Sequence, residues 1–317
     1  MFLLYVFTKK NYCPKCKHNS VHKDGFKHDK QQYQCNNCNC RFILKNHAWV
    51  ELAYIDYTIH KQSYAELEIK YGKNEKTIRK YFDKLAIPKR FKETLNIAIC
   101  LTMDTTFFKG VDGFGVVDLR AESKHIYWEY CQSERLSEYA KALSFVDTKY
   151  ELKSVTIDGK RGLRELIEKR YSYTVPVQYC HFHQVATITR YTTKNPKTDC
   201  GKGLRSLILK LKDLNYSDFN QQFENLKIEH KDFLKEKNEQ GNFSHQNLRK
   251  AVRSIQSNLG HLFTFESYPN LNIPKTTNSC DGNFGQWKRK IKLHNSLSKA
   301  RKMKMINEFL GYENKSV

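Results

Sequence analysis

Two Cys-x-x-Cys pairs near the start of the chain place the strongest constraint on how it folds. Cys13 and Cys16 form the first pair, and Cys35 and Cys38 form the second. Each pair makes a tight knuckle whose two thiolates can reach one tetrahedral ion, and the residues between the pairs close a hairpin. We therefore predict a structural Zn²⁺ site in a ribbon at residues 1–45, with the metal supplying its folding energy. Four free or redox-active thiols are the alternative. Other residues with suitable ligand atoms lie nearby: Cys40, His18, His22 and His28.

The chain as a whole is strongly basic. It contains 55 Lys and Arg against 33 Asp and Glu, a formal net charge of +22 at pH 7. A field of this sign and size favours a polyanionic partner and argues against an ordinary metabolic role. No apolar run approaches the roughly 20 residues needed to cross a bilayer, and the opening residues do not resemble a secretory signal. We therefore expect a cytoplasmic, nucleoid-associated protein with no membrane partner.

Residues 62–85 carry a helix-turn-helix pattern, within a DNA-binding domain expected at residues 46–95. Gly72 suits the tight turn, and Asn74 can cap the second helix. Apolar side chains with helical spacing are expected to bury one face of each helix: Tyr64, Leu67, Ile69, Ile78, Tyr81, Phe82 and Leu85. The other face of the second helix presents side chains suited to a DNA major groove: Lys76, Thr77, Arg79, Lys80 and Lys84. An ordinary helical hairpin is the alternative.

From residue 96 the pattern changes to short strands and helices. The continuous apolar run Ile97–Met103 predicts a buried strand that enters Asp104. Further strands are expected at Phe114–Leu119, His125–Tyr130, Val155–Ile157 and Val175–Tyr179, with a hairpin turn at Gly110–Gly113. Helices are expected at Leu136–Phe145 and Leu163–Ile167. This order predicts an α/β fold, a mixed sheet with helices packed on it.

The second half of the chain is mostly helical. Apolar residues recur at three- and four-residue spacing in a polar background, at Leu204, Leu207, Ile208 and Leu211. We therefore expect the first part of the core at residues 96–190, an α-helical insertion at 191–272, and a C-terminal catalytic helix with a basic tail at 273–317.

Two aspartates follow buried apolar strands. Asp104 ends the first strand and Asp158 ends the Val155–Ile157 strand. A carboxylate in that position costs desolvation energy unless a cation or hydrogen bonds compensate. Hard oxygen ligands suit Mg²⁺ or Mn²⁺, and two such ions can drive phosphodiester cleavage. We predict a catalytic divalent-cation site here. The alternative is that each aspartate only forms a turn.

A third carboxylate is expected from a helix near these strand ends. Asp281 is the candidate, because it is the one acidic residue in the basic stretch 275–304. A capping role at the start of that helix is the alternative, and Glu266 is the fallback ligand. After it, Trp287, Lys288 and Arg289 suit a surface that tracks a DNA backbone with one stacking platform.

The Cys180-His181-Phe182-His183 segment follows the last expected strand. It lacks a second Cys/His pair to complete a zinc site. Packing beside the carboxylates and a direct DNA contact by His183 stay as equal alternatives.

In order along the chain stand Asp104, Asp158, Cys180-x-x-His183, and Thr276-Thr277-Asn278 ahead of Asp281. This order, with the Lys-Leu-His-Asn-Ser-Leu-Ser run after it, resembles the mutator-type transposases of bacterial insertion sequences, members of the DDE, RNase H-like superfamily. The ribbon and helix-turn-helix in front resemble the zinc-binding variants of that group. The resemblance covers essentially the whole chain and is most specific over residues 97–184 and 273–300.

The resemblance implies an RNase H-like core with a helical insertion before the last acid. It implies a DDE-type transposase that cuts the ends of an insertion sequence and joins them to target DNA with Mg²⁺ or Mn²⁺. Asp104 and Asp158 match the first two catalytic acids. The third acid of the family is usually glutamate, and Asp281 is one methylene shorter. We expect double-stranded DNA as partner and a homodimer or higher assembly on it. A DNA-binding regulator that no longer cuts, and a stand-alone RNase H-like nuclease, are the alternatives.

Overall fold

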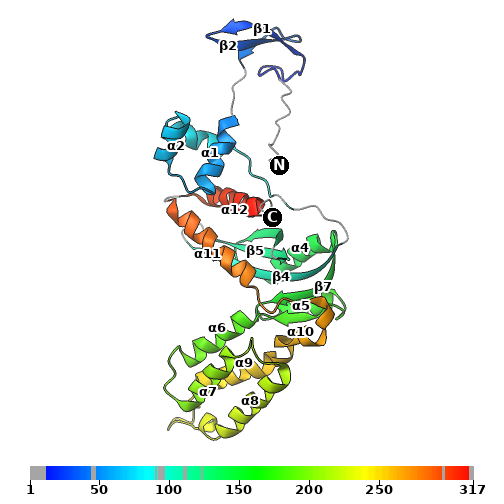
Figure 1. The fold of residues 1–317 in the computed structure, drawn as a ribbon, viewed down its shortest axis with the longest axis vertical. Coiled ribbons are helices and arrows are strands. Elements are labelled where there is room, and N and C mark those ends of the chain that lie inside the picture. Colours follow the sequence, from blue (N-terminus) through cyan, green and yellow to red (C-terminus); the bar gives the residue numbers. More distant parts are fainter. Residues whose placement is uncertain are drawn as a thin grey trace. The chain divides into compact units, whose positions relative to one another are not determined.

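The computed structural model describes residues 12–43, 48–89, 91, 97–109, 113–122, 124–294 and 297–313. Within the chain, two compact units form, Met1–Leu85 and Ala86–Val317 (Figure 1). Each has its own core, and each is described by itself below. The hairpin turn expected at Gly110–Gly113 falls largely outside the described residues.

The first unit begins with a three-stranded antiparallel sheet in the order β1-β2-β3. Its strands are β1 (Val21–Lys27), β2 (Lys30–Cys35) and β3 (Arg41–Ile43). His28 and Asp29, between β1 and β2, both have positive φ, at 49° and 56°. Such a two-residue turn matches the right-handed twist of the strands that it joins. Few side chains of this sheet are buried, so its own apolar core is small.

Three helices complete the first unit: α1 (Ala48–Thr58), α2 (Tyr64–Tyr71) and α3 (Glu75–Lys84). Gly72 ends α2 in the left-handed region at φ 58°, and the Asn74 side chain accepts a hydrogen bond from the N–H of Thr77 at 2.9 Å. The predicted pair of helices, its turn and its cap are confirmed. The expectation for Ile69 is wrong, because this side chain is 86% exposed. Leu67 is the buried position of α2, and Ile69, two residues on, points away from that stripe.

A five-stranded mixed sheet forms the centre of the second unit, in the order β6-β5-β4-β7-β8. Its strands are β4 (Ile97–Phe108), β5 (Phe114–Ala121), β6 (Lys124–Cys131), β7 (Tyr150–Ile157) and β8 (Val177–Tyr179). β4, β5 and β6 pair antiparallel, and β4, β7 and β8 pair parallel. The predicted mixed α/β sheet is confirmed, and its order and strand directions are compatible with an RNase H-like core. β4 runs past Asp104 to Phe108, so Asp104 lies inside the strand rather than at its end.

Helices α4 (Leu136–Asp147) and α5 (Leu163–Arg170) pack on one side of this sheet. We call this side the apolar face. Its strand residues alternate with those of the other side, and they share one core with α4 and α5. The sheet contributes these side chains to it: Leu101, Met103, Val117, Leu119, Val155 and Ile157.

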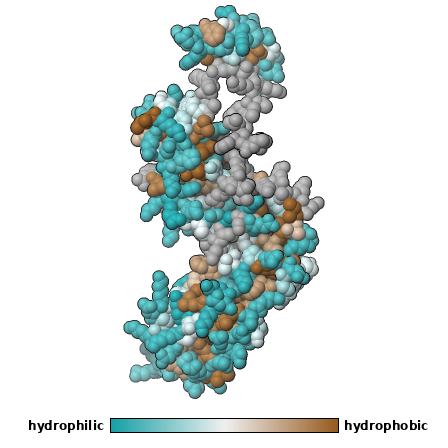
Figure 2. Space-filling view, viewed as in Figure 1, coloured by the Kyte–Doolittle hydropathy of each residue, from teal (hydrophilic) through white to brown (hydrophobic). Residues whose placement is uncertain are grey.

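The helices of the range 191–272, which the sequence predicts as an insertion, form a second apolar core together with the helix that begins at His181, ahead of that range. Its helices are α6 (His181–Thr192), α7 (Asp199–Leu209), α8 (Tyr216–Glu229), α9 (Gln246–Leu262) and α10 (Thr264–Ser267), with single 3₁₀ turns η1 (Phe233–Lys235) and η2 (Pro269–Leu271). The stripe predicted from spacing is confirmed, because all four members are buried: Leu204, Leu207, Ile208 and Leu211. Figure 2 shows a mainly hydrophilic surface over these helices on the face drawn, consistent with apolar side chains turned inward.

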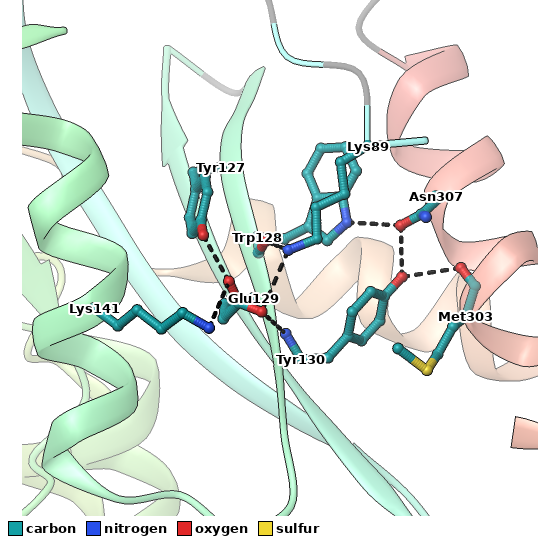
Figure 3. Close-up of polar contacts among 8 residues, drawn as sticks. All are labelled: Lys89, Tyr127, Trp128, Glu129, Tyr130, Lys141, Met303 and Asn307. Atoms are coloured by element: carbon teal, nitrogen blue, oxygen red, sulfur yellow. Dashed lines mark hydrogen bonds and ion pairs between the residues drawn. The ribbon is translucent and has the colours of Figure 1, made fainter. Parts of the chain in front are cut away.

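Two helices end the chain, α11 (Asn278–Leu293) and α12 (Lys299–Glu313). α11 contacts β4, and α12 contacts the edge strand β6. Asn307 of α12 accepts hydrogen bonds from the Trp128 indole at 3.0 Å and from the Tyr130 hydroxyl at 2.6 Å (Figure 3). Its amide also donates to the carbonyl of Ile87 at 2.8 Å. One amide therefore joins α12, β6 and the segment that leads into β4.

Lys89, in that same segment, lies against β6 (Figure 3). Its ammonium group donates to the carbonyl of Trp128 at 2.7 Å and lies 3.4 Å from the Glu129 carboxylate. Burial lowers the pKa of Lys89, against the opposite effect of Glu129.

No helix among the described residues is both long and apolar enough to cross a membrane.

Candidate functional site

The four cysteines of the two pairs come together in the first unit. Their Sγ atoms all lie within 4.8 Å of one another, with 3.4 Å between Cys13 and Cys38 and 3.6 Å between Cys16 and Cys35. Four thiolates around one tetrahedral Zn²⁺, at about 2.3 Å each, stand about 3.8 Å apart. The donor set and its spacing therefore fit a structural zinc ion, as the sequence predicts. Cys40 does not belong to the group of four.

The two knuckles share one backbone geometry. The N–H of Lys17 donates to the carbonyl of Cys13, and the N–H of Asn39 donates to the carbonyl of Cys35, both at 2.9 Å. Lys17 and Asn39 each have positive φ, at 62° and 54°. A hydrogen bond from the backbone N–H of His18 lowers the pKa of the Cys16 thiol to about 6. This favours the thiolate form that a metal requires at Cys16. At Cys38 a backbone hydrogen bond from Cys40 is outweighed by the neighbouring Cys16 thiol and by burial, which raise the pKa.

The side of the second unit's sheet opposite α4 and α5 is polar, and we call it the polar face. Alternation along the strands turns these side chains to it, and each is at most 5% exposed: Thr102, Asp104, Asp118, Ser154, Thr156 and Gln178. Buried polar groups require partners. Thr156 and Gln178, and in part Asp104, find theirs in the chain Leu262–Thr277, which we call the return segment. Thr102 donates to the carbonyl of Arg120, and the Ser154 hydroxyl has no partner among the described residues.

Outside the short helical turns α10 and η2 the return segment is irregular, so many of its backbone groups need hydrogen bonds from elsewhere. The polar face supplies them. Thr156 donates to the carbonyl of Pro274 at 2.6 Å, and the Cys100 thiol donates to that of Leu271 at 2.9 Å. The Gln178 side chain donates to the carbonyl of Leu262 at 2.8 Å and accepts from the N–H of Phe265 at 3.1 Å. The sheet therefore holds this irregular segment in one place and brings its end, Thr277, to Asp104.

Asp104 and Asp158 are neighbours in the parallel register of β4 and β7. Thr102 pairs with Thr156, so two residues further along Asp104 and Asp158 fall opposite each other on the same face. Asp104 is 5% exposed, and its carboxylate accepts from the N–H of Thr105 at 2.7 Å. The register of the two strands thus places the two predicted carboxylates on adjacent positions, Asp104 within β4 and Asp158 just after β7.

The Thr277 hydroxyl forms the centre of a small polar cluster. It lies 3.5 Å from the Asp104 carboxylate, 3.3 Å from the Cys180 sulfur and 3.3 Å from Nδ1 of His183. The N–H of Thr277 also donates to Cys180 at 3.2 Å. Burial disfavours the Cys180 thiolate, but hydrogen bonds from His183 and Thr277 outweigh it and lower the pKa of the thiol. The Cys-x-x-His segment, at the start of α6, therefore packs beside Asp104.

Asp158 has a further acidic neighbour that the sequence did not indicate. Burial, and then the charge of Glu134, raise the pKa of the Asp158 carboxyl, against the opposite effects of His183 and Lys160. Glu134 accepts from the Tyr139 hydroxyl at 2.7 Å and lies 3.4 Å from the Lys160 ammonium group. It sits in the loop before α4, where no motif marks it. Thr277 was also not singled out, although the Thr-Thr-Asn segment contains it.

The third predicted acid, Asp281, lies in the first turn of α11, and its side chain is outside the part of the chain that the structure describes. Among the described residues, one group of three or more His, Cys, Asp or Glu side chains lies close enough together to hold an ion, and it is the four cysteines of the ribbon. The fallback ligand Glu266 binds the start of α8 instead. Its carboxylate accepts a hydrogen bond from the N–H of Tyr216 at 3.1 Å.

The predicted DNA-contacting residues of α3 lie at the surface, with Thr77 half-buried and the others exposed: Lys76, Arg79, Lys80 and Lys84. Arg79 is also paired within its own unit. Its Nε donates to Glu75 at 2.6 Å, and its guanidinium lies 4.4 Å from the centre of the Tyr64 ring.

Two of the three residues predicted on α11 are exposed, Lys288 and Arg289. The expectation of an exposed stacking platform at Trp287 is wrong. Its side chain is fully buried, with ring centres 5.2 Å from Phe284 and 5.4 Å from His125. Phe284, Trp287 and Ile291 follow helical spacing, and this stripe is the apolar contact of α11 rather than a nucleic-acid surface.

No protein-family profile and no curated protein matches the chain. Among solved structures, the cryo-EM structure of the simian T-cell lymphotropic virus intasome in complex with PP2A regulatory subunit B56 gamma is similar at 12% sequence identity. The match covers 51% of this chain and 69% of that chain, with a TM-score of 0.21. A likeness at that score carries no argument about this protein.

Proposed function

We propose that the chain is a DDE-type DNA transposase, which binds the ends of an insertion sequence and catalyses metal-dependent strand cleavage and strand transfer. The observation that carries the proposal is the parallel register of β4 and β7. Thr102 pairs with Thr156, so Asp104 within β4 and Asp158 just after β7 fall on the same face of the sheet. Burial and the charge of Glu134 disfavour the Asp158 carboxylate, and a divalent cation relieves both costs. The basic charge of +22 favours a DNA substrate.

Asp104, Asp158 and Asp281 would hold the Mg²⁺ or Mn²⁺ of this site. The donor chemistry fits, because carboxylate oxygens are the ligands that these ions prefer. When bound, the ions activate an attacking oxygen and stabilise the leaving one in an in-line displacement. The described side chains supply two of the three carboxylates, and α11 carries the third position beside the same face.

The chain's own residues orient these groups. Thr277 and the Thr105 N–H fix the Asp104 carboxylate by hydrogen bonds. Nδ1 of His183 lies 3.3 Å from the Thr277 hydroxyl, and its charge lowers the pKa of Asp158. A protonated His183 can therefore stabilise a carboxylate or bind a DNA phosphate. In this proposal α3, with Lys76, Lys80 and Lys84, reads the ends of the element, and Lys288 and Arg289 hold the DNA backbone.

The test is a cleavage assay on a duplex that carries the ends flanking this gene, with the full chain and Mg²⁺. We expect end-specific nicks and strand-transfer products from the wild type, and none from Asp104→Ala. The matched control is Asp213→Ala, which removes an aspartate that is 65% exposed on the insertion and should leave both products unchanged.

Other outcomes separate the rival functions. Cleavage without preference for the ends and without strand transfer would replace the transposase by a stand-alone nuclease. Binding of the ends without cleavage by any variant, with Mg²⁺ and with Mn²⁺, would replace it by a DNA-binding regulator that does not cut.

A further inference from the structure

A buried acid–imidazole pair lies on the polar face, one strand away from Asp104. Asp118 of β5 is the direct cross-strand partner of Asp104, so both side chains share this face. The carboxylate of Asp118 accepts from Nδ1 of His125 at 2.8 Å, and the two side chains are 0% and 1% exposed. Among the described residues, the second oxygen of Asp118 has no hydrogen-bond partner. Burial of such a pair costs desolvation free energy, which the hydrogen bond between its members offsets in part.

A β-bulge turns His125 toward this face. The pairing of β5 with β6 shifts register between Leu119 and Arg120, so that Arg120 pairs with His125. Without the shift, regular alternation would place His125 on the apolar face together with Tyr127. Bulges commonly re-aim a side chain in this way. The bulge therefore directs the His125 imidazole toward α11.

The other nitrogen of His125 faces α11. Its Nε2 lies 3.3 Å from the side-chain nitrogen of Asn283, and its ring centre lies 5.4 Å from that of Trp287. In the neutral tautomer that donates from Nδ1 to the Asp118 carboxylate, Nε2 is an acceptor, and the Asn283 amide donates to it. A directed chain of two hydrogen bonds thus runs from β5 through His125 to α11.

Asn283 occupies a special position on α11. Phe284, Trp287 and Ile291 form the buried stripe of this helix. At about 100° per residue, positions 281 and 283 lie about 200° apart and flank that stripe on opposite sides. The apolar stripe determines which side of α11 faces the sheet, because rotation would expose Trp287 and Phe284, but its contacts do not select single atoms. A hydrogen bond on one flank fixes the rotation, and with it the position at 281 on the other flank.

We propose that Asp118, His125 and Asn283 are positioning residues, which set the rotation of α11 and thereby bring Asp281 to Asp104 and Asp158. This rests on the proposed function for its consequence in catalysis. The positioning itself is a property of the folded chain without metal or DNA, and can be measured separately.

Two substitutions of His125 divide the chain of hydrogen bonds. In His125→Asn the amide can still donate to Asp118 but is too short to reach Asn283. In His125→Gln the longer amide can reach Asn283. Asn283→Leu removes the last bond and keeps the branching of the side chain at Cγ, with a larger side chain. Asp232→Asn, in the helical insertion, is the matched surface control.

The first measurement is hydrogen exchange of the full chain without Mg²⁺ and without DNA. We expect the α11 amides to exchange about fivefold faster in His125→Asn and Asn283→Leu, the effect of losing one hydrogen bond. His125→Gln should restore protection close to wild type, and α4 and α5 should not change. Unchanged α11 exchange in both disruptive variants, or equal acceleration throughout the second unit, would overturn the proposal.

The second measurement is DNA cleavage as a function of Mg²⁺ concentration. We expect His125→Asn and Asn283→Leu to need about tenfold more Mg²⁺ for half-maximal rate, with KM for DNA unchanged, and His125→Gln to recover. Faster α11 exchange with an unchanged Mg²⁺ requirement would refute the link to Asp281. If no variant and no wild-type sample cleaves DNA, the proposed function fails, and the exchange experiment still decides whether the three residues position α11.

Discussion

The two faces of the central sheet are built from the same strands and differ in almost every other respect. On the apolar face, Leu101, Met103 and their neighbours pack against α4 and α5 through nondirectional contacts. On the polar face, Thr156, Gln178 and Asp118 make directed hydrogen bonds to the return segment and to His125. The apolar face stabilises the fold by burial. The polar face contributes less to stability for each buried side chain, and it places single atoms accurately.

This difference explains where the candidate site lies. A carboxylate is expensive to bury among aliphatic side chains, but it is tolerated where hydrogen-bond donors are already arranged. Asp104 stands among such donors, with Thr105 on its own strand and Thr277 at the end of the return segment. The same strand pairing that gives stability on one side therefore aligns the candidate site on the other.

The largest effect on stability is expected from a cavity on the apolar face. Leu101 is fully buried between the sheet and its helices. Leu101→Ala should lower the free energy of unfolding by about 2–5 kcal/mol, through lost burial and the cavity that remains. Denaturant titration measures this. The rate of DNA cleavage for each folded molecule should not change, and a loss of that rate would show that the two faces are not separable.

A smaller loss of stability is expected on the polar face, with a larger effect on activity. Thr156→Val keeps the shape of the side chain and leaves the carbonyl of Pro274 without its donor. The expected cost is about 1–3 kcal/mol, that of one unsatisfied buried group. Since the return segment leads to Thr277, cleavage should fall as well. The comparison of the faces is contradicted if Thr156→Val leaves cleavage intact while Leu101→Ala abolishes it.

A gain in stability is expected when Asp158 loses its charge. Its pKa in the folded protein is raised above the ordinary 3.8 by burial and by Glu134, so the folded state binds this proton more tightly than the unfolded chain. Ionisation of Asp158 therefore lowers stability above the raised pKa, and the penalty disappears as the pH falls through it. Asp158→Asn should raise Tm in Mg²⁺-free buffer at pH 7, with the difference from wild type shrinking toward pH 4. A constant difference across that range would exclude the electrostatic cause.

The smallest effect is expected at the rim of the apolar face. Arg170 of α5 donates to the Asp147 carboxylate of α4 at 2.9 Å, with side chains 29% and 35% exposed. Arg170→Ala should cost no more than about 1 kcal/mol, since solvent screens such pairs. Thermal unfolding at low and high salt measures it. A cost equal to that of Leu101→Ala would mean that ionic contacts, rather than packing, hold α4 and α5 together.

The sequence predicts the apolar face well, because burial on one side of a strand leaves a repeating pattern that can be read locally. The strands near Ile97, Phe114 and Val155 and the helix at Leu136 all occur as expected. The two knuckles of the ribbon are predictable for the same reason, because the Cys-x-x-Cys spacing is a local pattern that determines where the four thiols meet. Asp104 and Asp158 were found because a carboxylate after an apolar run is unusual.

The polar face was much less predictable. Thr156 and Gln178 bind a segment about 100 residues later in the chain, and no local pattern records that pairing. Glu134 sits in a loop, and His125 reaches the polar face only through a bulge. The error at Trp287 has a related cause, because an aromatic residue among lysines fits a DNA surface and a buried helix stripe equally well until the helix is docked.

The most direct test of the central claim is to map where a divalent ion binds. Fe²⁺ replaces Mg²⁺ in oxygen-ligand sites, and with ascorbate and peroxide it cuts the backbone next to the bound ion. In the full chain we expect cuts near Asp104 and Asp158 and in the first turn of α11. Excess Mg²⁺ should suppress these cuts, and the Asp104→Asn variant should not show them. The Leu101→Ala variant should be cut as the wild type is. Cuts that ignore Mg²⁺ and persist in Asp104→Asn, or no cuts at these strand ends, would contradict the claim that the two aspartates form a metal site.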